Sequence, residues 1–137
     1  MCIFCDIING KSKSYKIYEN KSTLAFLDIY PISYGHILVI PKKHYENIYS
    51  MDNEILTEVI KTVKTVTELL KEKLGINDVN IINSNGRIAN QTVFHYHMHV
   101  IPRRENDNLD FIDEWWVNKY IKINDTNFNE IMNKLKN

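Results

Sequence analysis

The feature that most constrains this chain is the segment HYHMHV, residues 95–100, in which histidines alternate with apolar residues. Side chains on a β-strand point to opposite faces in turn, so the segment predicts a strand with one imidazole face and one apolar face. We expect this strand to cover residues 92–101 and to end at Pro102. Its apolar face then carries Phe94, Tyr96, Met98 and Val100, and its other face carries His95, His97 and His99.

The rest of the chain predicts four more strands and a long helix. Apolar residues recur at steps of three and four from Ile55 to Leu74, which predicts a helix that begins near Ser50 or Asp52 and is capped by Gly75. A C-terminal helix is expected over residues 127–135. The element order predicts an α+β domain, with a five-stranded antiparallel sheet and one long packed helix. The remaining strands are expected at residues 15–18, 23–28, 36–40 and 79–83.

Length and charge narrow the class of protein. The 137 residues fit one domain spanning residues 1–137. The formal net charge is zero and no long run of one sign occurs, so we expect neither a nucleic-acid nor a membrane partner. Apolar stretches stay well below the roughly 20 residues of a membrane span, and the N-terminus lacks the basic region of a secretory signal. These observations predict a cytoplasmic protein.

The two cysteines, Cys2 and Cys5, form a CxxC pair, which in a reducing compartment predicts a metal or redox site. A redox role is disfavoured because no βαβ pattern follows. One ion held by all three alternating histidines is also disfavoured, since the outer two Cα atoms lie roughly 13 Å apart on a straight strand. A merely solvated histidine face is disfavoured because imidazole has no special preference for strands. The cysteines with His44 and His95 make a closed tetrahedral set of the structural zinc type.

The other histidines predict chemistry on phosphate. Neutral imidazole is a good nucleophile near pH 7, and its attack on phosphorus gives a phosphohistidine-type intermediate that water cleaves. His97 is the predicted nucleophile because a histidine flanks it on each side of its own face. His99 and His36 are candidates to orient it or to donate to phosphoryl oxygens. Neutral donors for the developing charge precede the strand: Asn85, the Gly86 amide, Gln91 and the Thr92 hydroxyl.

These residues resemble the signature of the histidine triad (HIT) family. Residues 95–101 have the form His-φ-His-φ-His-φ-φ, where φ is an apolar residue. Three longer blocks are similar to successive blocks of the Hint-like branch of that family, so the resemblance covers residues 2–104 and leaves a C-terminal tail at 105–137. It implies the HIT fold. The blocks read CIFCDIING, LAFLDIYPISYGHILVIPKKH and NGRIANQTVFHYHMHVIPR.

The resemblance implies a hydrolase that acts on the α-phosphate of small 5′-nucleotide derivatives. Purine nucleoside phosphoramidates or adenylylated amines are the expected substrates, with release of AMP or GMP. His97 is implied as the nucleophile that forms a nucleotidyl-histidine, and Asp28 as the group that binds the ribose hydroxyls. Thr92, with Gln91 beside it, is implied as a phosphate contact. The resemblance also implies a homodimer with one continuous sheet, and a structural zinc ion on Cys2, Cys5, His44 and His95.

Two alternatives stay open at this point. A dinucleoside polyphosphate hydrolase of the Fhit type differs only in its leaving group, and a non-catalytic, zinc-stabilised nucleotide-sensing module binds without turnover. Relatives such as galactose-1-phosphate uridylyltransferase are set aside, because they carry glutamine where this chain has His99. The sequence departs from many relatives at Ser84, where they have Asn, and at Asn90, where they have Gly. Residues 10–13, GKSK, lack the proline of a GEIP-like segment.

Overall fold

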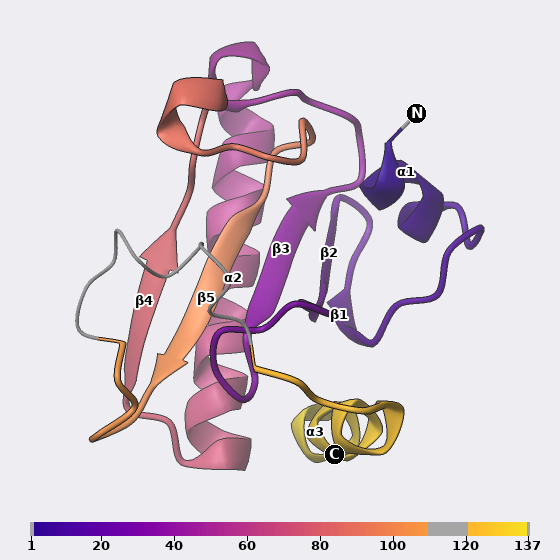
Figure 1. The fold of residues 1–137 in the computed structure, drawn as a ribbon. Helices are drawn as coiled ribbons and strands as arrows, with labels where there is room; N and C mark the ends of the chain where they lie inside the picture. Colours follow the sequence, from indigo (N-terminus) through magenta and orange to yellow (C-terminus); the bar gives the residue numbers. More distant parts are fainter. Residues whose placement is uncertain (1, 110–120, 137) are drawn as a thin grey trace.

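The computed structural model describes residues 2–109 and 121–136 (Figure 1). In these ranges five strands form one antiparallel sheet with the order β1-β2-β3-β5-β4, which confirms the predicted α+β class. The strands are β1 (Lys16–Glu19), β2 (Thr23–Leu27), β3 (Ile37–Pro41), β4 (Asp78–Ile82) and β5 (Met98–Arg103). The helices are α1 (Ile3–Ile8), α2 (Asn53–Leu74) and α3 (Asp125–Lys136), with 3-10 turns η1 (Ile48–Ser50) and η2 (Arg87–Ala89).

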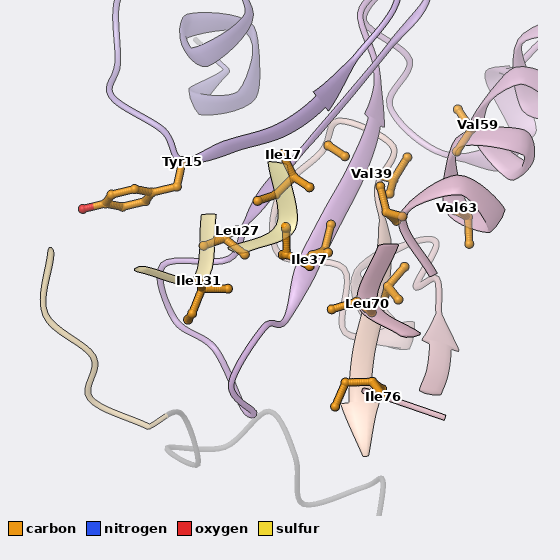
Figure 2. Close-up of a cluster of buried hydrophobic side chains, with 14 of the residues drawn as sticks. Tyr15, Ile17, Leu27, Ile37, Val39, Val59, Val63, Leu70, Ile76 and Ile131 are labelled. Carbon is orange, nitrogen blue, oxygen red and sulfur yellow. The ribbon is translucent and has the colours of Figure 1, made fainter. Parts of the chain in front are cut away.

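The long helix α2 follows the prediction closely. It begins after Asp52 and ends at Gly75, which adopts a left-handed φ of 68° and donates its amide to the Lys71 carbonyl. Glycine reaches this conformation without the steric cost that a Cβ atom imposes. The buried stripe of α2 packs on the sheet and forms the main core (Figure 2). From α2 this core takes Val59, Val63, Val66 and Leu70.

Strands β2 and β3 are buried on both faces, because α2 covers one face and α1 covers the other. Alternate residues such as Ala25 and Val39 belong to the core beneath α2. The intervening residues pack instead against α1 and its Phe4 and Ile7 side chains. The α1 face of the sheet is therefore distinct from the α2 face, and it is apolar over Leu24, Phe26, Leu38 and Ile40.

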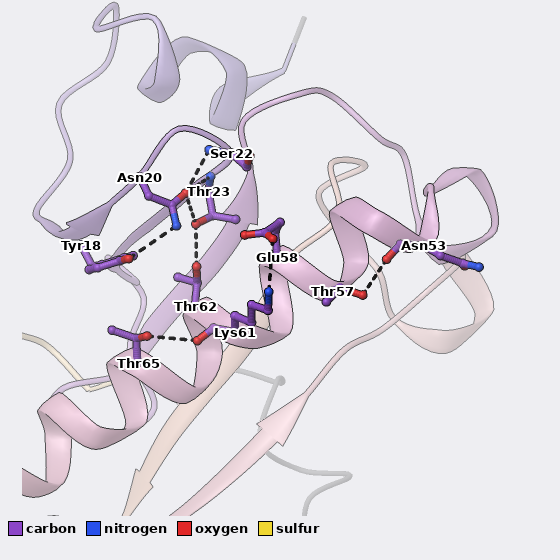
Figure 3. Close-up of polar contacts among 10 residues, drawn as sticks. All are labelled: Tyr18, Asn20, Ser22, Thr23, Asn53, Thr57, Glu58, Lys61, Thr62 and Thr65. Carbon is purple, nitrogen blue, oxygen red and sulfur yellow. Dashed lines mark hydrogen bonds and ion pairs between the residues drawn. The ribbon is translucent and has the colours of Figure 1, made fainter.

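A buried polar contact joins β2 to α2 (Figure 3). The Thr23 hydroxyl donates to Asn20 Oδ1 and lies 2.6 Å from the Thr62 hydroxyl. Thr62 must therefore donate to Thr23, whose single proton is already used. Asn20 Oδ1 also accepts from the amides of Ser22 and Thr23, so one side chain closes the β1–β2 turn and fixes it on the helix.

The fifth strand was predicted too early, because β5 begins at Met98 rather than at residue 92. Before Met98 the backbone groups take partners outside the sheet ladder. The Tyr96 amide donates to the Tyr45 carbonyl, and the Asn83 side chain donates to the His97 carbonyl. Phe94, expected on the core side, is exposed instead.

The predicted end of this strand at Pro102 was also wrong, since β5 continues to Arg103. β3 pairs with β5 only as far as Ile37, opposite Val100, so β5 has β4 alone as a neighbour at Pro102. Proline is tolerated at such a position because no second strand needs its missing amide.

The C-terminal helix was expected at 127–135 and is α3, which begins two residues earlier. It packs Phe128, Ile131 and Leu135 into the main core, where the Phe128 ring stacks on Tyr15 at 4.9 Å. Part of the predicted tail, residues 110–120, lies outside the described residues. None of the helices in the described ranges is long and apolar enough to cross a membrane.

Candidate active site and metal centre

Four polar residues from three segments, Asp28, His36, His97 and His99, meet on the α1 face of the sheet. The Asp28 amide donates to the His36 carbonyl, so these two residues extend the β2–β3 ladder by one step. Asp28 and His36 thereby keep the side-chain direction of Phe26 and Leu38. His99 pairs with Leu38 across β3 and β5, so it shares the same face. A cavity of about 290 Å³ opens there, with walls that include Phe4, Ile7, Phe26, Asp28, His97 and His99.

The protonation state of His97 follows from one contact. Its Nδ1 atom lies 2.8 Å from the carbonyl oxygen of His95, and a carbonyl can only accept. Nδ1 therefore carries the proton, and Nε2 of the neutral ring carries the lone pair. The ring is buried and packs edge-on against Phe4 at 5.3 Å between centroids. This packing and the carbonyl contact hold a neutral imidazole with its nucleophilic nitrogen defined.

A chain of two hydrogen bonds sets the protonation of His36 and His99. The Ile32 amide donates to His36 Nδ1, so neutral His36 carries its proton on Nε2. His36 Nε2 lies 2.9 Å from His99 Nδ1 and donates to it, which leaves the proton of neutral His99 on Nε2. Asp28 Oδ2 lies 3.5 Å from His36 Nε2 and 3.9 Å from His99 Nδ1. His99 thus contributes a donor to the cavity that His97 lines.

Burial sets the charge of these histidines. It lowers the pKa of His97 and of His36 below the ordinary 6.5. The His95 carbonyl opposes this for His97, and the Asp28 carboxylate opposes it for both rings, but only in part. Burial also lowers the pKa of His99 well below 6.5, and the neighbouring His36 adds to the effect. All three rings are therefore neutral at pH 7, the form in which imidazole acts as a nucleophile or donates one hydrogen bond.

The four predicted metal ligands lie together at the start of α1. Sulfur and ring nitrogen atoms of Cys2, Cys5, His44 and His95 all lie within 4.8 Å of one another. His95 Nδ1 is 3.3 Å from the Cys2 sulfur, 3.6 Å from the Cys5 sulfur and 3.2 Å from His44 Nδ1. A tetrahedral zinc ion needs about 3.5 Å between sulfur and nitrogen ligands and about 3.3 Å between two nitrogens. The donor set therefore fits zinc in both chemistry and spacing.

The outer contacts of His95 agree with this fit. Its Nε2 lies 2.8 Å from the Pro41 carbonyl and must donate to it, so the lone pair is on Nδ1, which faces the cysteines. Ligating histidines characteristically donate their other ring nitrogen in this way. Burial lowers the pKa of His95 to about 4, so the ring is neutral at pH 7, as a ligand must be.

A second cluster with metal-ligand side chains does not pass the same test. Asp28, His36 and His99 also lie within 4.8 Å of one another. The nitrogen of His36 that faces this cluster is Nε2, which carries the proton because Nδ1 accepts from the Ile32 amide. A protonated ring nitrogen has no lone pair for a metal ion. We therefore assign this cluster to hydrogen bonding.

The predicted phosphate donors all lie in the loop before β5, but they differ in whether they line the cavity. Thr92 lines the cavity, whereas Asn85, Gly86 and Gln91 do not. The role of Thr92 as a phosphate contact stays a prediction. Gln91 is buried and holds the loop together. Its side-chain oxygen, Oε1, accepts a hydrogen bond from the Gly86 amide, and its Nε2 donates to the carbonyls of Glu46 and Val93. Asn85 Oδ1 accepts from the Ile48 amide. The nucleotide-binding role of these three residues stays a prediction.

Two residues that sequence reasoning left out of the site, Ser84 and Asn90, line the cavity. Both had been noticed only as departures from the family pattern. Asn90 adopts a left-handed φ of 68°, a conformation that glycine reaches most easily and asparagine tolerates. The apolar wall from α1 was missed as well. A signal for it was present in the spacing of Ile3, Phe4 and Ile7, which lie on one side of a helical turn.

Comparison with known proteins decides the family. The family model described as HIT domain matches residues 9–106, most of the chain. The chain belongs to the HIT family. A HIT-like protein of Methanocaldococcus jannaschii is 45% identical over 136 residues and is matched over 99% of both chains. The family resemblance inferred from the triad and its flanking blocks is thereby confirmed.

Two further HIT proteins are informative. The adenosine 5′-monophosphoramidase HNT1 of Candida albicans is 40% identical, over 76% of this chain and 71% of its own length. A zinc-bound HIT protein of Mycobacterium smegmatis has a solved structure that superposes with a TM-score of 0.84 at 33% identity. That match covers 98% of this chain and 90% of the other.

Proposed function

We propose that this HIT protein is a nucleotide hydrolase that cleaves small 5′-nucleotide derivatives at the α-phosphate, with nucleoside phosphoramidates as the preferred substrates. His97 Nε2 attacks phosphorus, the bond from phosphorus to the leaving amine breaks, and the amine departs with a proton taken from solvent. Water then attacks the nucleotidyl-His97 intermediate, breaks the new phosphorus–nitrogen bond and gives one proton back to solvent. The second product is the nucleoside 5′-monophosphate.

The observation that carries this proposal is the contact between His97 Nδ1 and the His95 carbonyl oxygen. It places the lone pair on Nε2 before substrate arrives. Attack on phosphorus turns the neutral ring into a cation whose remaining N–H is on Nδ1. A carbonyl oxygen 2.8 Å away stabilises that charge as it forms, so the contact is worth more in the transition state than in the ground state.

The cavity supplies complementary groups for the rest of the substrate. His99 Nε2–H and the Thr92 hydroxyl are the proposed donors to phosphoryl oxygens. Asp28 is the proposed acceptor for the ribose hydroxyls. It follows β2 directly, and its side chain is mostly buried between the cavity and His36. The apolar wall of Phe4, Ile7 and Phe26 suits a nucleobase.

A volume of about 290 Å³ lies near the lower end of the usual range for small-ligand sites, about 300–1,000 Å³. One nucleoside fits better than two, so in this proposal the leaving group extends outside the cavity. The amide leaving group is preferred because the similar Candida albicans protein is an adenosine 5′-monophosphoramidase. Zinc on Cys2, Cys5, His44 and His95 is proposed to have a structural role, since four protein ligands leave no position for substrate.

The test is a turnover assay with three AMP and three GMP derivatives that carry an amine, a second nucleotide through a polyphosphate, or a sugar as leaving group. We expect the amidates to give the highest kcat/KM. A higher value for the dinucleoside polyphosphate assigns the Fhit type of activity instead. Binding of AMP without turnover of any derivative assigns a nucleotide-sensing role and overturns the proposal. The control variant in this assay is Lys43→Ala, which removes a charge outside the cavity and should behave like the wild type.

A further inference from the structure

Lys13 is the one lysine or arginine among the described residues that line the cavity. It lies in the segment GKSK, residues 10–13.

The path of the chain places Lys13 between α1 and Asp28. After α1 the backbone folds back on the last turn, where the amides of residues 11 and 12 both donate to the Asp6 carbonyl. The Tyr15 carbonyl then accepts from the Leu27 amide, which brings residues 13 and 14 alongside the end of β2. Lys13 and Ser14 both line the cavity there.

The Lys13 ammonium contacts two neighbours, and both contacts are weak because the ammonium is open to solvent. It lies 3.7 Å from Asp125 Oδ2 at the start of α3, and 5.2 Å from the centre of the Tyr15 ring. Both members of the ion pair are well exposed, at 69% and 75% of the side chain. An ion pair so open to solvent contributes little, so the ammonium can turn to a ligand at small cost.

A nucleoside bound as in the proposed function, on which this inference rests, brings its base to this cation. The phosphate is at His97 and the ribose at Asp28, so the base occupies the apolar part of the cavity near Ile7. A lysine has three donors and no acceptor. Guanine and hypoxanthine present the acceptors O6 and N7 on one edge, whereas adenine presents its 6-amino group beside N7.

We propose that Lys13 makes this site selective for 6-oxopurine nucleotides, which carry guanine or hypoxanthine, over adenine nucleotides. The selecting contact is a hydrogen bond from the ammonium to O6. With adenine the ammonium faces another donor, so the contact is lost. Because the ammonium is exposed to solvent, the selectivity is modest, about fivefold in kcat/KM.

The test compares guanosine, inosine and adenosine 5′-phosphoramidates on the wild type and three variants. Lys13→Met removes the donor at similar length, and Lys13→Arg keeps it. Lys11→Met is the control, since Lys11 is exposed, two residues away and outside the cavity lining. We expect guanosine and inosine substrates to be preferred about fivefold by the wild type, Lys13→Arg and Lys11→Met. In Lys13→Met the three substrates should become equal.

Calorimetric binding of GMP, IMP and AMP to the same four proteins separates this inference from the proposed function. A preference for GMP and IMP that depends on Lys13, in a protein without turnover, upholds the inference and rejects the hydrolase. Equal kcat/KM values in the wild type, or a preference that survives in Lys13→Met, overturn the inference alone. A preference for guanosine without inosine also overturns it, because the 2-amino group is then the feature recognised. Failure to bind any of the three nucleotides overturns both.

Discussion

His97 receives its orientation from His95, whose carbonyl oxygen lies 2.8 Å from His97 Nδ1. The side chain of the same His95 belongs to the cluster of Cys2, Cys5 and His44. One residue therefore contributes its ring to the candidate metal site and its backbone to the candidate nucleophile. Any change that releases the ring of His95 should also disturb the protonation and position of His97.

The metal site gives the first prediction. Protein purified without chelator should contain one zinc per chain, and Cys5→Ser should lose it. Loss of a structural ion that joins α1, the segment after β3 and the segment before β5 should lower Tm by on the order of 10 °C. Because His95 serves both sites, kcat should fall as well. Elemental analysis, thermal unfolding and turnover are the measurements.

Lys43→Ala is the control for that variant, since it lies next to His44 in the chain and outside the ligand set. It should keep the full zinc content and the wild-type Tm. Wild-type protein without metal, or with a Cys2–Cys5 disulfide, would contradict the zinc assignment.

Asp28 gives a prediction about the sugar. If its carboxylate accepts from both ribose hydroxyls, Asp28→Ala should reduce the preference for ribonucleotide over 2′-deoxyribonucleotide substrates by at least about tenfold. A hydrogen bond to a charged group contributes roughly 1.5–3 kcal/mol, and about 1.4 kcal/mol corresponds to one decade. The measurement is the ratio of kcat/KM for the two sugars. A ratio equal to that of the wild type shows that Asp28 only supports His36 and His99.

The low pKa of His97 predicts the acid side of the pH profile. The unprotonated ring is the reactive form, and burial lowers its pKa below the ordinary 6.5. A lowered pKa keeps the ring unprotonated to lower pH, so the acid-side decline of kcat/KM should have its midpoint below pH 6.5. The uncatalysed rate, measured with His97→Ala, is subtracted because phosphoramidates are acid-labile. A decline centred at or above pH 6.5 is the contradicting result.

Assembly as a homodimer, implied by the family resemblance, stays a prediction. Two apolar side chains on the outer edge of the fold favour it, Ile60 on α2 and Ile81 on the edge strand β4, which are about half exposed. Sedimentation at tens of micromolar should give a dimer for the wild type. Ile81→Lys should shift it to monomer, because a charge on an edge strand opposes pairing. Ile121→Lys, away from this edge, should remain dimeric; a monomeric wild type contradicts the prediction.

Much of the fold was predictable because it depends on local patterns. The apolar stripe of α2 repeats at every turn, and the C-terminal cap depends on Gly75 alone. The sequence alone therefore located both ends of the helix within a few residues. The limits of β5 were not predictable in this way. They depend on where β3 and β4 stop pairing and on Tyr45 and Asn83, which are distant in sequence.

The site shows the same division. The grouping of Cys2, Cys5, His44 and His95 could be inferred from residue chemistry, and the structure brings these four side chains together. The tautomers of His95, His97 and His36 could not be inferred from the sequence. They depend on the Pro41 carbonyl, the His95 carbonyl and the Ile32 amide, respectively. The partners of Gln91 could not be inferred either, because its side-chain amide bonds to backbone groups of its own loop and of Glu46.

The proposed hydrolysis depends most directly on His97 as the nucleophile. The decisive measurement is mass spectrometry of wild-type protein quenched in alkali during turnover of an AMP amidate, followed by peptide mapping. We expect the mass of one AMP unit on the peptide that contains His97, lost on brief acid treatment and absent from His97→Ala. That variant should keep its fold, checked by circular dichroism, and should lose hydrolysis. Full turnover by His97→Ala, or an AMP adduct on another residue, would contradict the account.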